Sequence, residues 1–354
     1  MSSMASAATR RSTMRDVAAL AGVSLKTVSR VINNEPGVAR GTVERVLAAV
    51  SALRYVPDIT AANLARGEGG SRSIALLIAT VDDPFSAAIF RGVEEVALPR
   101  QVAVFAASTE GRPEAETRLT LAFTSRNVDG LIITPTAQDH RALADLLAPH
   151  MPCVYVDRDP TGIAADVVTS NNREAARVAV EHLLDNGHRR IGVVTDETSI
   201  STAVDRQLGY RDAIMAAGLP IDESLIVSGV ATQELGQQAV MYLMEMEQPP
   251  TAIFAARNMA SLGAVRALKK AGLSGQIALV GMDDIELSDV IEPPLTIMRQ
   301  NPVEMGRLAA VRLFARLDGD DSAPRHVFVP TELVERGSGE ISPPASVRHR
   351  KIVE

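Results

Sequence analysis

Short apolar runs recur along residues 73–282 and alternate with segments of helical periodicity. They lie at 73–79, 102–107, 130–134, 153–156, 190–195, 224–227, 252–256 and 277–282. Runs that are apolar throughout are typical of strands in a parallel sheet that helices cover on both faces. A spacing of roughly 25 residues leaves room for one crossover helix between strands. Because the rhythm breaks near 169–189, we expect two α/β parallel sheets, and therefore two lobes.

The segment before these strands predicts a small all-α head. Thr13 and Asp16 have capping-box spacing and open a first helix that ends near Ala21. Gly22 breaks that helix, and Ser24 caps a second one. Two short helices joined by a tight glycine turn are typical of a helix-turn-helix. The second helix places Val28, Val31 and Ile32 on one face, and a third helix running to about Leu53 places Val43, Val46, Leu47, Val50 and Leu53 on one face.

Charge is divided unevenly between the head and the rest of the chain. The formal net charge is −7, yet residues 1–57 hold eight Lys and Arg against three Asp and Glu. The head therefore carries +5 and the remainder −12. A basic head on an acidic body indicates that the head binds a polyanion while the body does not.

Cysteine content and hydropathy exclude several classes of protein. The single cysteine, Cys153, excludes an internal disulfide and suits a reducing compartment. It lies in the apolar run MPCVYV, which predicts a buried, inert thiol. No window of about 18 apolar residues predicts a membrane span. Residues 1–12 lack the apolar stretch of a secretory signal, so we expect a disordered leader and a cytoplasmic protein.

The head sequence resembles the LacI/GalR family of bacterial repressors over TMRDVAALAGVSLKTVSRVINNEPGVARGTVERVLAAVSALRYVPD. The resemblance continues through VDGLIITP, HLLDNGHRRIGVV and VGMDD to about residue 340. It implies a body like the periplasmic binding proteins and a homodimer that binds pseudo-palindromic double-stranded operator DNA. It also implies a small sugar-like effector between the lobes, with no cofactor. The corresponding domains are a leader at 1–12, a helix-turn-helix domain at 13–57, a hinge helix and linker at 58–71, a two-lobed effector-binding and dimerisation domain at 72–340, and a flexible tail at 341–354.

The second helix supplies the predicted base contacts. A recognition helix in the major groove presents its N-terminal side chains to base edges. The resemblance assigns base reading to Leu25, Lys26 and Arg30. Lys and Arg suit guanine, and a leucine suits a thymine methyl. The other predicted DNA-binding residues are Thr13, Ser24, Thr27, Ser29 and Asn33 as short polar groups near phosphate, and the hinge residue Leu64 as a minor-groove wedge. The alternatives are an ordinary surface helix and a linker leucine.

Two positions depart from the family pattern. Ala39 stands where the family usually has a serine at the start of the third helix, and alanine cannot cap. We expect that helix start to be weaker by about 1 kcal/mol. Asp58 stands where the family commonly has asparagine, which argues against a phosphate contact there.

Effectors of such two-lobed proteins bind beyond the carboxyl ends of the strands, where the lobes face each other. Arg206 matches the family arginine that commonly holds the effector. At Arg257-Asn258 the family usually reads Asn-Asp, so this chain loses an anion and gains a cation. We therefore hypothesise an anionic effector, such as a sugar acid or sugar phosphate, held by Arg206 and Arg257. The alternative is a neutral sugar with Arg257 pointing to solvent. The full set of strand-end candidates is Asp82, Asp83, Phe85, Ser108, Thr134, Asp157, Arg158, Asn171, Arg206, Arg257, Asn258 and Asp283.

An enzyme and a periplasmic binding protein are the rival classes. Carboxylates cluster at Asp157/Asp159 and Asp283/Asp284, but no Ser/His/Asp order, Walker loop or metal-ligand spacing accompanies them. The six histidines are scattered, so we expect no metal site. The helical head and the absence of a signal peptide disfavour a periplasmic protein.

Overall fold

The computed structural model describes residues 12–32, 35–56, 70–136, 138–147 and 151–344. The chain divides into two compact units, residues 1–71 and 72–354, and each is described by itself. The boundary between the predicted head and body falls at this division. The predicted hinge with Asp58 and Leu64, and Asn33 of the head, lie outside the described residues.

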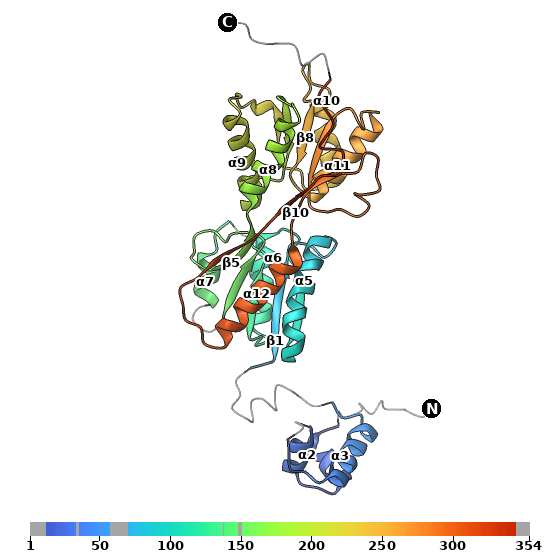
Figure 1. Cartoon of the computed structure of the whole chain (residues 1–354). Helices are drawn as coiled ribbons and strands as arrows, with labels where there is room; N and C mark the ends of the chain where they lie inside the picture. Colours follow the sequence, from blue (N-terminus) through green and yellow to red (C-terminus); the bar gives the residue numbers. More distant parts are fainter. Residues whose placement is uncertain (1–11, 33–34, 57–69, 137, 148–150, 345–354) are drawn as a thin grey trace, which may run out of the picture. The chain divides into compact units, whose positions relative to one another are not determined.

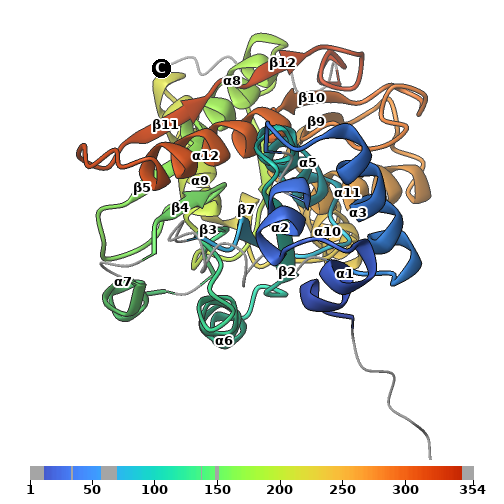
Figure 2. The same cartoon turned by 90° about the horizontal axis from the view of Figure 1, so that it is seen from below.

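The described residues of the head form the three predicted helices, α1 (Met14–Ala21), α2 (Leu25–Ile32) and α3 (Arg40–Ala52) (Figures 1 and 2). The capping box is confirmed, because Asp16 N donates to Thr13 Oγ1 while Thr13 N donates to the Asp16 carboxylate at 2.8 Å. Gly22 ends α1 in the left-handed conformation, at φ 63°. The Ser24 cap is also confirmed, since Ser24 Oγ accepts a hydrogen bond from Thr27 N at 3.1 Å.

The helices of the head enclose one apolar core. Val28 and Val46 are fully buried, and Val17 packs beside them. The prediction for Leu47 is wrong, because its side chain is 53% exposed while Ala49 is buried. Residues 46, 49, 50 and 53 follow the three-to-four-residue period of one helix face, and residue 47 lies off that face.

Two six-stranded sheets form the body, one in each lobe. Their strand orders are β11-β5-β4-β3-β1-β2 in lobe 1 and β12-β10-β9-β8-β6-β7 in lobe 2. All neighbours pair in parallel except β10 and β12, which are antiparallel. Lobe 1 holds β1 (Ser73–Ile78), β2 (Ala103–Ser108), β3 (Gly130–Ile133), β4 (Cys153–Val156), β5 (Asp166–Ser170) and β11 (His326–Val329); lobe 2 holds β6 (Ile191–Val194), β7 (Ile226–Val227), β8 (Ala252–Ala255), β9 (Ala278–Met282), β10 (Thr296–Arg299) and β12 (Glu332–Val334).

All eight predicted strands are present, and β5, β10, β11 and β12 were missed. β11 and β12 are edge strands with exposed residues, so they lack a continuous apolar run. β2 is an edge strand as well. The prediction that helices cover both faces of the sheet is wrong at this strand. Phe105 in β2 is 49% exposed.

Helices cover both sheets. Those of lobe 1 are α5 (Pro84–Ala97), α6 (Pro113–Thr124), α7 (Arg141–Leu147) and α12 (Pro302–Leu317), and those of lobe 2 are α8 (Asn172–Asp185), α9 (Ser201–Ala216), α10 (Gln233–Met244) and α11 (Asn258–Lys270) (Figure 1). Single 3-10 turns lie at Leu98–Arg100 and Glu223–Leu225. Among the described helices, none is long and apolar enough to cross a bilayer.

The chain passes between the lobes three times within the described body. It crosses after β5, after β10, and again between β11 and β12. As a result the helix after β5, α8, packs on the sheet of lobe 2, and the helix after β10, α12, packs on lobe 1. Each lobe is therefore built from separate parts of the chain, and three short segments connect the two lobes.

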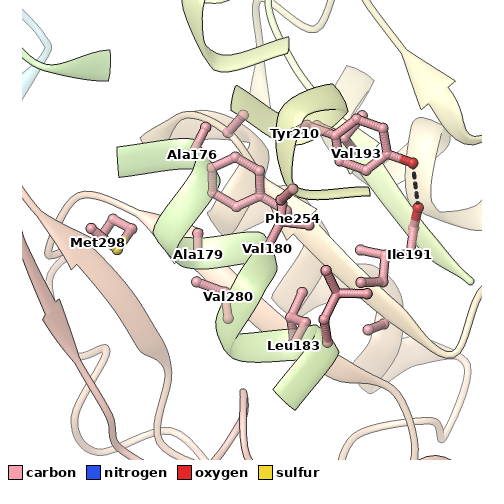
Figure 3. Close-up of a cluster of buried hydrophobic side chains, with 14 of the residues drawn as sticks. Ala176, Ala179, Val180, Leu183, Ile191, Val193, Tyr210, Phe254, Val280 and Met298 are labelled. Carbon is pink, nitrogen blue, oxygen red and sulfur yellow. Dashed lines mark hydrogen bonds between the residues drawn. The ribbon is translucent and has the colours of Figure 1, made fainter. Parts of the chain in front are cut away.

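Side chains of α8 fill the core of lobe 2 (Figure 3). Val180 and Leu183 pack against strand residues such as Val193 and Phe254. The hydroxyl of Tyr210 in α9 donates to Ile191 O at 2.8 Å, so this buried polar group is satisfied. The helices α8 and α9 approach closely at Gly209, where a Cβ would lie 2.1 Å from Arg173 O. In lobe 1, Cys153 is only partly buried, so the prediction of a buried thiol is wrong in part. Desolvation still raises the pKa of the thiol to about 12, which agrees with an inert group.

The start of α3 provides a test of the capping argument. Ala39 occupies the N-cap position, and no side-chain hydrogen bond is formed there. Ala39→Ser supplies a hydroxyl for the free N–H groups of the first turn and should stabilise α3 by about 1 kcal/mol. Hydrogen–deuterium exchange of the α3 amides in the intact chain should slow about fivefold. The control Ala48→Ser adds the same hydroxyl at an exposed mid-helix site; equal slowing in both variants would contradict the explanation.

Candidate functional site

A polar cleft of about 460 Å³ lies between the two lobes of the body. It is located at the carboxyl ends of the strands, as the parallel sheets predict. Lobe 1 contributes residues after β1 and β4, and lobe 2 contributes residues after β6, β8, β9 and β10 together with the first turns of α9. The lining residues are Asp83, Phe85, Asp157, Arg158, Thr195, Asp196, Thr202, Ala203, Arg206, Ala256, Arg257, Asn258, Asp283 and Gln300.

Most of the residues predicted for the effector site are brought together here. The cleft is lined by Asp83, Phe85, Asp157, Arg158, Arg206, Arg257, Asn258 and Asp283 from the predicted set. Asp82, Ser108, Thr134 and Asn171 are not part of the lining that the described residues form.

Each of these four has another location. Asp82 is exposed in the turn before α5. The Ser108 hydroxyl donates to Ala79 O at 3.2 Å, and Thr134 is buried, with its N–H bonded to Leu77 O. Asn171 caps α8 by accepting a hydrogen bond from Glu174 N.

Other cleft residues were missed from the sequence. Thr195 and Asp196 directly follow β6, so the strand-end rule applied to 190–195 identifies them. Gln300 follows β10, and it was missed because that strand was missed. Thr202 and Ala203 come from the first turn of α9, and no pattern in the sequence predicts that a helix start lines the cleft there.

Arg206 is held in a fixed orientation at the back of the cleft. Its side chain is only 7% exposed. Nε donates to Asn172 Oδ1 at 2.8 Å, and Nη1 donates to Ala256 O at 2.8 Å. The carboxylates of Asp283 and Asp157 compensate its charge, although burial lowers the pKa of the guanidinium. These two bonds fix the orientation of the guanidinium. Its remaining N–H groups are therefore already positioned to donate to a ligand.

Arg257 is paired within the protein. It precedes α11, and its Nη1 donates to the Asp196 carboxylate and to Val230 O, the latter at 3.3 Å. Its side chain is 22% exposed, so it does not extend into solvent as the neutral-sugar alternative assumed. Asp196 offsets the positive charge that the sequence adds at this position.

Asp157 and Asp283 occupy equivalent places in the two lobes. One follows β4 and the other β9, which have the same position in their sheets. Both have left-handed backbones, with φ 72° and 68°. Each backbone N–H bonds at 2.9 Å to the neighbouring strand, Asp157 to Val168 O and Asp283 to Met298 O. The strained conformation therefore fixes one carboxylate from each lobe at the cleft.

Desolvation dominates the electrostatics of these two acids. It raises the pKa of Asp157, and it raises the pKa of Asp283 to about 6. Arg206 opposes the shift in both cases, and Gln300 Nε2 donates to Asp283 Oδ1 at 2.7 Å. In the described part of the chain no group of three or more His, Cys, Asp or Glu is placed to hold a metal ion.

The first turn of α2 forms the second candidate site. Leu25 is 43% exposed and Lys26 is also exposed. Ser24 and Thr27 bond to each other through their hydroxyls at 2.9 Å. The predicted base-reading residue Arg30 is engaged within the head, because Nη2 donates to Pro36 O at 2.6 Å and Nε lies 3.4 Å from Glu35 Oε2. A base contact by Arg30 therefore requires these bonds to be exchanged.

Comparison with known proteins matches both units. Residues 13–58 match the family described as "Bacterial regulatory proteins, lacI family", and residues 180–339 match the "Periplasmic binding protein-like domain". The chain is 31% identical to the HTH-type transcriptional repressor PurR of Histophilus somni (strain 129Pt), over 92% of this chain and 98% of that protein. It is 32% identical to the repressor of the same name from Haemophilus influenzae (strain PittEE), with the same coverage.

Solved structures agree with these relatives. A transcriptional regulator CelR–cellobiose complex is 31% identical, covers 93% of this chain and 100% of its own, and has a TM-score of 0.69. A lac repressor dimer bound to operator and the anti-inducer ONPF is 27% identical, covers 93% and 99%, and has a TM-score of 0.83.

The raised pKa of Asp283 predicts a pH dependence of stability. The folded state holds this proton up to about pH 6, whereas the ordinary carboxyl value is 3.8. Its contribution to the free energy of unfolding is therefore fully present below pH 3.8 and is lost as the pH rises through about 6. We expect the free energy of unfolding, measured with urea, to differ between wild type and Asp283→Asn by an amount that changes from pH 3.8 to about pH 6. A difference that stays constant with pH would contradict the assignment; the exposed Asp289→Asn is the matched control.

Proposed function

The chain belongs to the LacI/GalR family of bacterial transcriptional regulators, and from that premise we propose that it is a homodimeric, operator-binding repressor controlled by a small carbohydrate-like effector. It is a DNA-binding transcriptional repressor and not an enzyme, as its relatives are named repressors. We place its action in the bacterial cytoplasm, where operator DNA lies.

The observation that carries the proposal is the exposed first turn of α2. Leu25 and Lys26 project from a helix whose other face is buried in the head core. An exposed leucine beside a lysine suits a thymine methyl and a guanine edge. We assign phosphate contacts to Thr13, Ser24, Thr27, Ser29 and Asn33, and a minor-groove contact to Leu64, all from the sequence resemblance.

Exposed apolar surface on the body supports a second copy as the partner. Phe105 of β2 stacks on Phe123 of α6, with ring centroids 6.5 Å apart, and Leu121 of α6 is 44% exposed. In lobe 2, Tyr242 of α10 is 56% exposed. Surface of this kind is costly in a monomer and typical of an interface. Two-fold symmetry would then present two heads to a pseudo-palindromic operator.

The charges of the cleft favour a neutral effector over an anionic one. Four aspartates line the cleft against three arginines, and Arg257 already pairs with Asp196. An anionic group would therefore meet arginines whose charges Asp157, Asp196 and Asp283 already compensate. A polyhydroxylated molecule can instead donate to the aspartates and accept from Arg206. This revises the anionic hypothesis in favour of the neutral sugar.

Effector control follows from the two-lobe design. A ligand that contacts both lobes changes the angle between them, because three short crossing segments join the lobes. The effector must change operator affinity by the same factor by which the operator changes effector affinity, because the two binding equilibria are linked.

The DNA sequence specificity of the intact protein tests the base contacts assigned to α2. Selection from a random duplex library by the intact protein should yield a pseudo-palindrome. Lys26→Ala should relax the base preference at one position in each half-site, while Thr27→Ala should weaken binding to all sequences alike. Identical specificity profiles for both variants, or failure to select any sequence, would refute the base-reading assignment.

The chemical class of the effector can be tested by binding measurements on the cleft. Titration calorimetry with matched neutral sugars, sugar acids and sugar phosphates should show tightest binding of a neutral sugar. Arg206→Ala should weaken that binding about a hundredfold, since it removes a buried charged donor. Arg257→Ala should cost roughly tenfold or less, because the Arg257 guanidinium is occupied by Asp196. Preferential binding of an acid or phosphate that Arg257→Ala abolishes would instead establish the anionic alternative.

A further inference from the structure

Two hydrogen bonds cross the cleft directly between the described parts of the lobes. Asp159 N of lobe 1 donates to Ser201 Oγ of lobe 2 at 3.2 Å. Asn258 Nδ2 of lobe 2 donates to Asp83 Oδ1 of lobe 1 at 2.8 Å. The second bond involves a carboxylate acceptor, and bonds of this kind are among the stronger ones in proteins.

Both partners of the second bond are fixed at helix starts. Asp83 caps α5, with Phe85 N donating to its Oδ1 at 3.1 Å. Asn258 begins α11, and its own Oδ1 accepts a hydrogen bond from Met259 N at 2.7 Å. Because the amide oxygen is occupied, the amide nitrogen is directed at Asp83. The bond therefore joins two rigid elements from opposite lobes.

The chemistry of residue 258 decides whether this contact attracts or repels. The charge of Asp83 already acts on the nearby carboxyls of Asp157 and Asp283. A carboxylate at 258 would place a further anion against Asp83 in a cleft that excludes much of the solvent. The amide has nearly the same shape, but it supplies a donor and no charge.

We propose that Asn258 and Asp83 form a latch that holds the two lobes together across the cleft. The latch requires a neutral donor opposite the Asp83 carboxylate, so its strength is set by the identity of residue 258. An effector then acts by replacing this bond with its own contacts to both lobes. That consequence rests on the proposed function, whereas the latch itself does not.

Spin-label distances test the latch in the intact chain. In a Cys153→Ala background, Glu114→Cys and Thr198→Cys carry nitroxides on opposite lobes; both positions are exposed and adjoin Pro113 and Ser199 at the mouth of the cleft. Labelled chain is diluted with unlabelled chain so that double electron–electron resonance reports distances within one molecule. No DNA or effector is present.

Asn258→Asp should lower the population of the short, closed distance about tenfold or more, because it replaces an attractive bond with repulsion. Asn258→Ala, which removes the donor without adding charge, should lower it less. The double variant Asp83→Asn/Asn258→Asp restores the bond with donor and acceptor exchanged, and should recover the closed distance.

Asn127→Asp is the matched control, since it adds the same charge at an exposed site of lobe 1 away from the cleft. Its distance distribution should equal that of the parent. An unchanged distribution in Asn258→Asp, or failure of the exchanged pair to recover the closed distance, would overturn the latch. Because effector binding is not measured here, the result is independent of which effector class the cleft accepts.

Discussion

The guanidinium of Arg206 lies almost fully buried where the two lobes meet, and a buried charge is tolerated only when hydrogen bonds and opposite charges compensate it. Asn172 at the start of α8 and Ala256 at the end of β8 accept its hydrogen bonds, while Asp157 and Asp283 supply the charge. These partners come from both lobes. The compensation of one arginine therefore depends on the arrangement of both lobes, and the two aspartates with left-handed backbones provide part of it.

Compensation by aspartates also explains why an extra arginine does not make the cleft cationic. Arg257 has Asp196 beside it, and four aspartates still line the cavity. The cleft carries little net charge, and some of its polar atoms, such as Thr195 Oγ1 and Gln300 Oε1, have no hydrogen-bond partner among the described residues. Such groups suit a ligand rich in hydroxyl groups. Carboxylates from the two lobes act on one another there, because the charges of Asp83 and Asp157 raise the pKa of Asp283. The amide of Asn258 avoids one such repulsion.

The head follows a different principle. Its core is small, and its stability depends on caps such as the Thr13–Asp16 box and Ser24 as well as on packing. Its positive charge is separated from the acidic body in sequence, so the same chain can attract a polyanion at one end and repel it over the rest. The engagement of Arg30 by Pro36 and Glu35 shows that even within the basic head not every cation is freely available for DNA.

The sequence by itself determined the helices of the head, their caps and the eight apolar strands, because capping chemistry and hydrophobic periodicity act between residues that are close in the chain. It also identified Asp157 and Asp283 as cleft residues, since parallel strands present their carboxyl ends at one edge, and the family resemblance identified Arg206. Only the tertiary structure decided the edge strands β11 and β12, the exchange of α8 and α12 between lobes, and the exposure of Leu47. It alone gave Arg257 its partner Asp196 and Asn258 its partner Asp83. Those partners are 61 and 175 residues apart in sequence, and no local pattern specifies a contact over such a separation.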